Sequence, residues 1–470
     1  FSYLMSCPSV EKALASGSSS DLLIMESSSS SSSSTRISSV QKWQSNVRVL
    51  HDFPLQYHAL VIANQSWKLI SILYHGTPRW IAKLIRLILF VISLLPAFVV
   101  FACYYVITSD RIAVAYIQEK PKRTSRHYLD VYGSQKTQQQ PKREEGKAVV
   151  IFLTGGAWII GYKMWGALLA RALVPFGVLV IIPDYRNFPQ TNIKGMIDDI
   201  NAAIHWTFQN CHLNGGDPKR IVLVGQSAGA HIGSCVLLQK IQDAANNTST
   251  DNRDSRWSVG DLCGFIPVSG PYDLIKMRDI LHQHGLDKGI VNAMFCNDLK
   301  RYSPTCFLLE LDNNGEGIDI SAESIQRDRS SNGDNNSIRS TTTSPRTYNM
   351  FRSQFPPTCV IHGKTDRTVP YSISVDFFKA LQRIQIQNTV SLKLYEGWGH
   401  TDPILEAPFA GDHAFHRDVF ELVQLWTNNK TEKGSGEDST TFTVFDPSNP
   451  ACKKICPSVL VDLGRFFNPF

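Results

Sequence analysis

The sequence lacks the features that mark several classes of protein. Its ten cysteines are scattered and include no C-x-x-C pair. This spacing indicates neither a zinc site nor a disulfide framework, so we expect reduced thiols. The net charge is +6 over 470 residues, and the basic residues are spread along the chain, which gives no reason to expect a nucleic-acid partner. We therefore expect no metal, no cofactor and no nucleic acid.

The front of the chain is poor in apolar residues. Residues 1–48 contain an unbroken serine run at 27–34, and such a segment cannot bury enough apolar surface to fold. It also lacks the order of basic and apolar regions of a secretory signal peptide. We expect a disordered leader over 1–48, followed by an amphipathic juxtamembrane segment over 49–86.

One long apolar run stands out at residues 87–107, where 21 residues carry no charge. As a helix this run spans about 31 Å, which matches the ~30 Å hydrocarbon core of a bilayer. Basic residues precede it and Tyr104 and Tyr105 lie near its end, as at the two interfaces of a membrane span. A buried core helix is the alternative, but core helices usually keep a polar face. The run predicts a transmembrane helix.

Beyond the apolar run, stretches of strand length alternate with helical patterns. We expect strands at residues 126–132, 147–153, 178–182, 221–224, 262–268, 358–362 and 391–395. We expect helices at residues 164–174, 195–210, 230–240, 373–384 and 413–427. This alternation predicts an α/β fold with a mainly parallel sheet and helices on both faces over residues 109–430.

Three polar or irregular parts interrupt or follow this domain. Residues 246–258 and 313–346 are rich in Asn, Ser, Asp and Gly, and are predicted to be flexible insertions. The short apolar helical pieces within 271–309 predict a helical cap. The tail at 431–470 is polar, and its structure is left open.

The run Gly-Gln-Ser-Ala-Gly at 225–229 follows a β-branched apolar strand and precedes a helical run. This context is typical of a nucleophile elbow, in which small neighbours permit the sharp turn that exposes the serine. The helix that follows provides free backbone N–H groups and the positive end of its dipole. Ser227 is therefore the candidate nucleophile.

A serine nucleophile also needs donors for the oxyanion that forms in the reaction. One predicted strand leads directly into the run TGGAW, whose small residues allow backbone N–H groups to approach a substrate closely. We expect Gly156, Ala157 and Ala228 to be these donors. The alternative is a tight glycine turn that binds no ligand.

The acid and the base should follow the serine in that order, each after a later strand. Asp366 and His400 lie in loops after the strands at 358–362 and 391–395, and the ends of parallel strands gather at one edge of a sheet. Alone, Asp366 could be a turn or helix cap and His400 a surface residue; their order after Ser227 favours catalysis. Four other histidines compete for the role of base: His231, His362, His413 and His416.

Residues of about 110–430 resemble an α/β-hydrolase of the hormone-sensitive-lipase-like carboxylesterase type. The runs TGGAW, DYRNFP, GQSAGAH, HGKTDRTVP and GWGHTDP resemble, more narrowly, plant isoprenylcysteine methylesterases. These are membrane enzymes of the endoplasmic reticulum and Golgi that hydrolyse the methyl ester of prenylated cysteine. Thr154 stands where the wider group usually has histidine, and it fits the narrower family.

The resemblance implies a nucleophile at Ser227, an acid at Asp366 and a base at His400. It also implies oxyanion loops at 155–157 and 226–228, which adds Gly155 and Gln226 to the site. The implied substrate is a prenylated cysteine methyl ester, as a small molecule or at a protein C-terminus. The implied location is the endoplasmic reticulum and Golgi membrane, and the many basic residues after the apolar run favour a catalytic domain in the cytosol.

Two other functions stay open from the sequence. A broader membrane carboxylesterase or deacetylase would use the same three residues with a different pocket. A hydrolase-fold receptor that binds a small molecule without cleaving it is the second alternative. Such receptors typically lose the base, whereas His400 is present.

Overall fold

The computed structural model describes residues 58, 60–64, 66–67, 78–108, 111–117, 123–134, 146–246, 257–315, 345–431 and 443–469. The predicted leader at 1–48 and most of both predicted insertions lie outside these residues. Of the predicted juxtamembrane segment 49–86, only His58, residues 60–64 and 66–67, and the start of one helix are described.

Eight strands form one sheet in the order β1-β2-β4-β3-β5-β6-β7-β8. β1 pairs antiparallel with β2 and β2 antiparallel with β4, whereas the other pairs are parallel. The strands are β1 (Arg111–Ala115), β2 (Tyr128–Tyr132), β3 (Lys147–Leu153), β4 (Leu179–Pro183), β5 (Gly216–Gln226), β6 (Gly264–Val268), β7 (Thr358–Gly363) and β8 (Val390–Tyr395). The mainly parallel sheet that the sequence predicts is confirmed, and β1 is an edge strand that the pattern missed.

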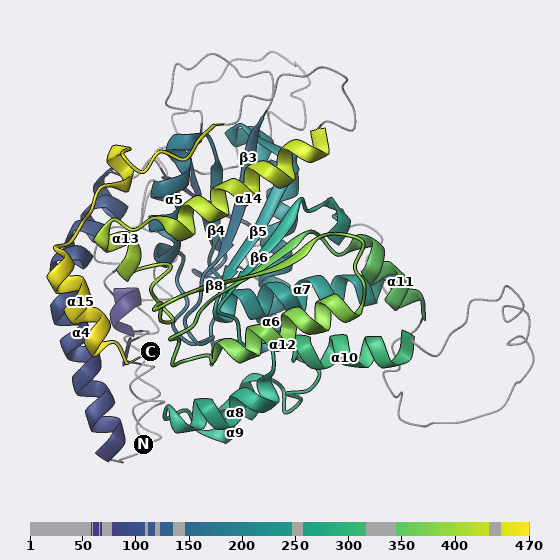
Figure 1. The fold of residues 1–470 in the computed structure, drawn as a ribbon, viewed down its shortest axis with the longest axis horizontal. Helices are drawn as coiled ribbons and strands as arrows, with labels where there is room; N and C mark the ends of the chain where they lie inside the picture. The colour runs from purple at the N-terminus through teal and green to yellow at the C-terminus, as the bar shows by residue number, and fades with distance from the viewer. Residues whose placement is uncertain are drawn as a thin grey trace, which may run out of the picture. The chain divides into compact units, whose positions relative to one another are not determined.

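Helices cover both faces of this sheet (Figure 1). α5 (Ala167–Leu173) and α14 (Ala414–Thr431) contact β4, β3 and β5 on one face. α6 (Ile193–Asn210) and α7 (Ala228–Ala245) contact each other and β5 on the other. The remaining helices and turns after β3 are η3 (Lys163–Gly166), η4 (Val174–Phe176), η5 (Cys211–Asn214), η6 (Val259–Asp261), α8 (Leu274–Gln283), α9 (Lys288–Met294), α10 (Pro304–Gly315), α11 (Pro345–Gln354), α12 (Tyr371–Arg383), α13 (Glu406–Ala410), η8 (Pro450–Cys452) and α15 (Ser458–Phe467).

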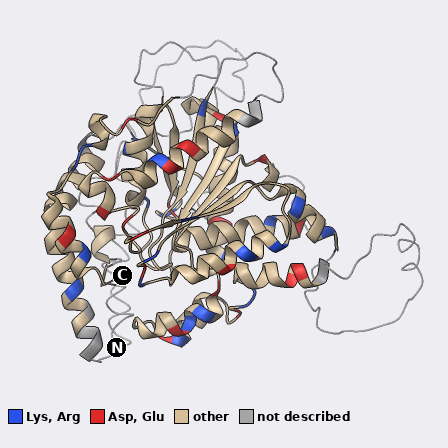
Figure 2. Ribbon diagram, in the orientation of Figure 1, with Lys and Arg blue, Asp and Glu red and all other residues tan. Residues whose placement is uncertain are grey.

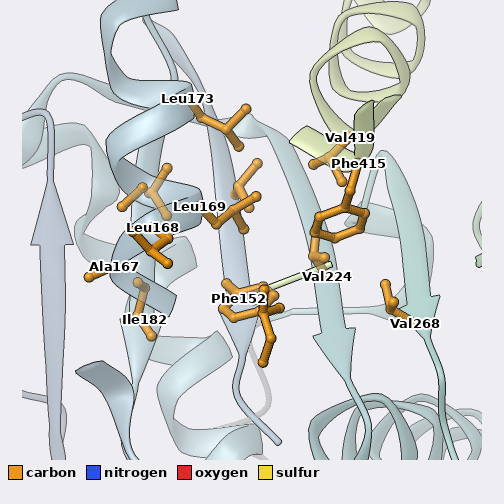
Figure 3. Packing of buried hydrophobic residues seen from close by; sticks show 14 of the residues in the cluster. Phe152, Ala167, Leu168, Leu169, Leu173, Ile182, Val224, Val268, Phe415 and Val419 are labelled. Carbon is orange, nitrogen blue, oxygen red and sulfur yellow. The ribbon is translucent and has the colours of Figure 1, made fainter. Parts of the chain in front are cut away.

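Alternate residues of the central strands pack into two apolar layers. Figure 3 shows Phe152 of β3 and Val224 of β5 between the side chains of α5 and α14. Leu153, which follows Phe152, and Leu223, which precedes Val224, instead lie against Gly233 of α7. Because successive side chains of a strand point to opposite faces, a strand covered on both sides is apolar throughout, as the sequence of β3 is.

One helix precedes the sheet, α4 (Pro78–Cys103), which continues as the π-helical turn η1 (Tyr104–Thr108). Within the described residues, the part Leu84–Val106 is the one stretch long and apolar enough to cross a membrane. The helix begins nine residues before the predicted span at 87–107. Figure 2 shows no charged residue on α4 beyond its first turns. The apolar part of the helix therefore nearly coincides with the predicted span, and the helix also includes the basic residues that precede it.

α4 also packs along the α/β domain, which the sequence did not predict. Leu94, Ala97 and Phe101 on its inner side are buried. The ring of Phe98 meets the ring of Phe409 in α13 edge-on, with 5.6 Å between the ring centroids. The opposite side of α4 is exposed and apolar, and includes Ile88, Ile92, Leu95 and Val99.

The tail contains helices that the sequence does not reveal. The composition of residues 431–470 leaves their structure open, and the structure shows η8 and α15 within them. α15 packs against α4 (Figure 1), where Gly464 lies beside Leu94. Six of the ten residues of this helix are apolar, but the average composition of the whole tail concealed them.

Candidate active site

Ser227 lies at the sharp turn between β5 and α7. Its φ of +53° and ψ of −121° form a strained backbone conformation for a residue with a side chain. The turn requires close approach by its neighbours. A Cβ at Gly225 would lie 2.8 Å from the backbone of Ala230, and one at Gly229 would lie 2.6 Å from the carbonyl carbon of Leu153. The glycines of G-x-S-x-G are therefore needed for the turn itself.

The three candidate catalytic residues meet in one hydrogen-bonded line. His400 Nε2 lies 2.8 Å from Ser227 Oγ, and His400 Nδ1 lies 2.7 Å from Asp366 Oδ2. A carboxylate only accepts hydrogen bonds, so Nδ1 carries the proton and Nε2 is free to accept the serine proton. Each residue is more than nine-tenths buried. This arrangement can activate a serine for attack on an ester.

Asp366 is held at both of its oxygens. Oδ1 accepts from the backbone N–H groups of Thr368 and Val369 at 2.8 and 2.9 Å. Oδ2 accepts from His400 and lies 3.0 Å from His362 Nε2. Burial by itself raises the pKa of Asp366, but His400 and the hydrogen bonds from His362 and His400 outweigh it and lower this pKa below its usual range.

His362, one of the histidines that compete for the role of base, contacts the candidate acid instead. Its Nε2 faces two acceptors, Asp366 Oδ2 and the carbonyl of Val369 at 2.9 Å, so this nitrogen carries a proton. Its Nδ1 lies 2.6 Å from Ser374 Oγ in α12. The signal in the sequence was the spacing His-Gly-x-x-Asp, which places the histidine at the end of a strand just before the acid.

The glycine loop after β3 lies against the nucleophile. A Cβ at Gly155 would lie 2.9 Å from the Cβ of Ser227. Gly156, Ala157 and Trp158 all have positive φ, of 124°, 50° and 61°. The strained loop and the first turn of α7, which begins at Ala228, therefore flank the serine with backbone rather than side chains. Backbone N–H groups in this position can stabilise an oxyanion.

The run DYRNFP donates hydrogen bonds to this loop. Tyr185 Oη donates to the carbonyl of Thr154 at 2.9 Å, and Asn187 Nδ2 donates to the carbonyl of Gly161 at 2.8 Å. The N–H of Phe188 donates to the carbonyl of Trp158 at 2.8 Å. Three carbonyls of the loop are thus fixed, which preserves its strained conformation.

Gln226 also forms a contact that the sequence does not reveal. The sequence resemblance assigns it to the oxyanion loops, and its backbone does precede Ser227 there. Its side chain, however, is buried and donates from Nε2 to the carbonyl of His400 at 3.2 Å. The side chain therefore connects the elbow to the loop of the candidate base.

The other histidines are engaged elsewhere. His231 Nδ1 accepts from Trp158 Nε1 at 3.3 Å and Nε2 lies 2.7 Å from the carbonyl of Tyr302. Burial lowers the pKa of His231 to about 4, so it is neutral at physiological pH. His413 and His416 bond to each other, 2.8 Å apart. None of these three replaces His400 beside Ser227.

The segment between β6 and β7 contacts the glycine loop. α8 and α9 coincide closely with the helical pieces predicted for a cap, and contact each other. Phe295, just after α9, packs edge-on against Trp158 of the glycine loop, with 5.0 Å between ring centroids. The predicted cap thus reaches the oxyanion side of the site. The described part of the chain contains no group of three or more residues suited to hold a metal.

The sequence was compared with proteins of known function. It is 35% identical over 395 residues to a probable isoprenylcysteine alpha-carbonyl methylesterase of Oryza sativa subsp. japonica, and the match covers 83% of this chain and 78% of that protein. The chain belongs to the isoprenylcysteine alpha-carbonyl methylesterase family. It is 31% identical over 415 residues to the isoprenylcysteine alpha-carbonyl methylesterase of Arabidopsis thaliana, which covers 87% of this chain and 82% of that one.

Two family models match parts of the chain, and a solved structure aligns with its fold. Residues 129–305 match the BD-FAE model, and residues 319–434 match the prolyl oligopeptidase family. The solved structure of esterase B from Lactobacillus Rhamnosis (HN001) aligns with a TM-score of 0.50 at 14% identity, and covers 75% of this chain and 98% of that chain. The α/β-hydrolase fold is thereby confirmed. As a member of this family, the protein is a carboxylic ester hydrolase.

Proposed function

We propose that this esterase is bound to a membrane and hydrolyses the methyl ester of prenylated cysteine to the free carboxylate and methanol. The line Ser227–His400–Asp366, with hydrogen bonds of 2.8 and 2.7 Å, carries the catalytic part of the proposal. The substrate class is supported by the relatives, which are named as isoprenylcysteine methylesterases. No cofactor is required for this chemistry.

The first half-reaction transfers the cysteinyl carbonyl group to the enzyme. Ser227 Oγ attacks the ester carbonyl carbon while His400 Nε2 takes the serine proton. The carbonyl oxygen becomes an oxyanion, which accepts hydrogen bonds from the backbone of residues 155–157 and of Ala228. The tetrahedral intermediate then breaks its bond to the methoxy oxygen, which leaves as methanol with the proton from His400.

The second half-reaction uses water. His400 takes a proton from a water molecule, whose oxygen attacks the acyl-enzyme carbonyl. Collapse of this second intermediate releases Ser227, which regains its proton from His400, and the free prenylcysteine carboxylate. Asp366 stays ionised throughout because its pKa is lowered, and it stabilises the protonated form of His400.

Membrane attachment is assigned to α4. We propose that the apolar part of this helix is inserted in the membrane of the endoplasmic reticulum and Golgi, with the catalytic domain on the cytosolic side. The predicted transmembrane helix and the greasy substrate support this location. A prenyl chain is dissolved in the membrane, so an attached esterase meets it at high local concentration.

In the structure, fewer of the basic residues that follow α4 support a cytosolic domain than the sequence alone suggests. Arg111 and Arg126, which follow the helix, are buried in the hydrolase domain. Arg111 lies 3.6 Å from Asp130, and Arg126 lies 2.9 Å from Asp184. These two charges stabilise the fold and do not face a membrane surface. The orientation therefore needs its own experiment.

The substrate experiment compares esters that differ only in the prenyl group. Methanol release is measured from S-farnesyl cysteine methyl ester and from S-methyl cysteine methyl ester with the full chain. We expect kcat/KM to favour the prenylated ester by at least about a hundredfold, because many buried methylenes then contribute to binding. Equal values for the two esters would instead support a broader carboxylesterase. Failure to react with any ester or fluorophosphonate would support a receptor.

The orientation experiment uses possible glycosylation sites beyond α4. The full chain is expressed in microsomes and treated with a glycosidase. We expect no change in its mobility, because a cytosolic domain is not glycosylated. A shift that disappears when the acceptor asparagines are replaced would place the domain in the lumen. The asparagines to replace are Asn246, Asn247, Asn335 and Asn429.

A further inference from the structure

The C-terminal helix α15 is apolar on two sides. Its inner side, with Val461 and Gly464, is buried, and a Cβ at Gly464 would touch Leu94 of α4 at 3.0 Å. Its outer side exposes Val459 by 77%, Leu463 by 43% and Phe466 by 71%. These three residues are spaced i, i+4 and i+7, so they form one stripe. A surface helix normally turns polar residues outward.

α15 packs side by side with α4. Arg86 of α4 donates to the carbonyls of Phe466 and Asn468 at 2.8 and 3.3 Å. Leu94, two turns later in α4, lies against Gly464, earlier in α15. The two helices therefore run antiparallel (Figure 1). Both expose apolar side chains: α4 exposes residues such as Ile88 and Ile92, and α15 exposes its stripe, next to the exposed side chain of Asp462.

Charged residues near α15 suit a lipid surface. Lys453 and Lys454 precede the start of the helix by five and four residues and are exposed. Asp462, the one acidic residue of the helix, pairs with Arg465 at 3.2 Å. An apolar side flanked by lysines is the pattern of helices that lie at the boundary between headgroups and acyl chains.

We infer that α15 is a second membrane-contacting helix, and that its outer stripe Val459, Leu463 and Phe466 lies against the phospholipid bilayer next to α4. This inference rests on the proposed attachment of α4 to the membrane. A second copy of this chain is the other possible occupant of the stripe. The bilayer is favoured because α15 packs against α4, whose exposed residues are apolar, and because exposed lysines precede α15.

The inner end of α15 connects this contact to the active site. Arg465 Nε donates to Asp402 Oδ1 at 2.8 Å, and Asp402 Oδ2 accepts from the N–H of Gly399 at 2.7 Å. Asn468 Nδ2 donates to Thr401 Oγ1 at 2.8 Å. Gly399 and Thr401 flank His400 in the chain. The helix at the lipid surface thus holds the loop of the candidate base.

The first experiment labels the wild-type full chain from within the lipid. The protein is reconstituted in phosphatidylcholine vesicles that contain a phospholipid with a diazirine in its acyl chain. Irradiated protein is digested and the labelled peptides are identified by mass spectrometry. We expect label in α4 and in α15. The peptides with Ile275 of α8 and Leu425 of α14, which also expose apolar side chains, should remain unlabelled.

The outcomes separate the inference from the proposal on which it rests. Label in α4 without label in α15 overturns the membrane contact of α15 and leaves the attachment through α4 intact. Label in neither helix overturns both. Equal label in the control peptides also overturns the inference, because exposure alone would then explain the reaction with lipid.

The second experiment tests the stripe by substitution. The triple variant Val459→Ser, Leu463→Ser, Phe466→Ser is compared with the control Leu425→Ser, which removes an exposed apolar side chain of α14. We expect turnover of vesicle-bound prenylcysteine methyl ester to fall at least about fivefold in the triple variant only, because less apolar area contacts the bilayer. Turnover of a water-soluble short ester reports whether the fold is intact.

Two results would contradict the inference here. An unchanged rate on the vesicle-bound ester in the triple variant would show that the stripe does not contribute to turnover at the membrane. A change from dimer to monomer by light scattering, with equal lipid labelling of the variant and the wild type, would identify a second copy as the occupant.

Discussion

The side chain of Gln226 donates a hydrogen bond to the backbone carbonyl of His400 at 3.2 Å. Gln226 directly precedes the candidate nucleophile, and His400 is the candidate base. The two loops are 174 residues apart in the chain and are otherwise joined only where Ser227 meets His400. The side-chain amide of Gln226 therefore fixes the position of His400 relative to the turn that carries Ser227.

Replacement of Gln226 by leucine should slow the chemical step. The change keeps the volume of the side chain and removes the donor to His400, so the imidazole is less well aligned with Ser227. We expect kcat to fall about tenfold while KM stays within about twofold. Steady-state kinetics of the soluble ester measure both. Gln239→Leu, on the exposed side of α7, is the control, and an equal fall in it would contradict the prediction.

His362 should act as a positioning residue through Asp366. His362→Phe keeps a ring in the strand and removes the N–H that faces Asp366 Oδ2 at 3.0 Å. We expect kcat to fall about tenfold or more with little change in KM, because Asp366 no longer holds His400 in one orientation. His362→Gln, whose amide can donate, should recover part of the rate. If His362→Phe lowered the melting temperature but left kcat unchanged, the residue would be purely structural.

Glu406 should make stability depend on pH. Burial, then the nearby charge of Asp402, raises the pKa of Glu406 to about 7. Between the unfolded value of about 4.3 and about 7, the folded chain keeps a proton that the unfolded chain releases. The free energy of unfolding is therefore highest below this window and falls as the pH rises through it.

Glu406→Gln removes this titration. We expect the drop in melting temperature between pH 5 and pH 8 to be smaller in the variant than in the wild type. Oε1 remains available to accept from Thr401 and Asn468, so the local contacts of this oxygen are kept. Differential scanning fluorimetry across this range measures the drop. Parallel curves for the two proteins would show that Glu406 is ionised in the folded state.

Strong local patterns were predicted well from the sequence. β3 coincides with the predicted strand at 147–153, because a strand buried on both faces is apolar throughout. Ser227, Asp366 and His400 were found from their order after successive strands, and the structure brings them within hydrogen-bond distance. Each of these signals is local to one strand and the loop that follows it.

Long-range partners could not be predicted in the same way. His362 looked like a core histidine because its bonds to Asp366 and Ser374 depend on how β7 and α12 pack. The ten residues of α15 form too short a pattern to predict a packed helix. The helix packs against α4, which lies far away in the sequence. Gly156 is a subtler case: a Cβ there would lie 2.5 Å from the backbone nitrogen of Gly161. This glycine is required by the loop itself, in addition to any need for space near a substrate.

The central claim is that Ser227 is the nucleophile of this esterase, and the most direct test is to locate its covalent adduct. The full chain is treated with a fluorophosphonate, and the modified peptide is sequenced by mass spectrometry. The account predicts one adduct per chain on Ser227, complete loss of prenylcysteine methyl ester hydrolysis, and no adduct in Ser227→Ala, whose own rate falls by about three orders of magnitude or more. An adduct on another residue, or a Ser227→Ala variant that keeps more than about a tenth of the wild-type rate, would contradict it.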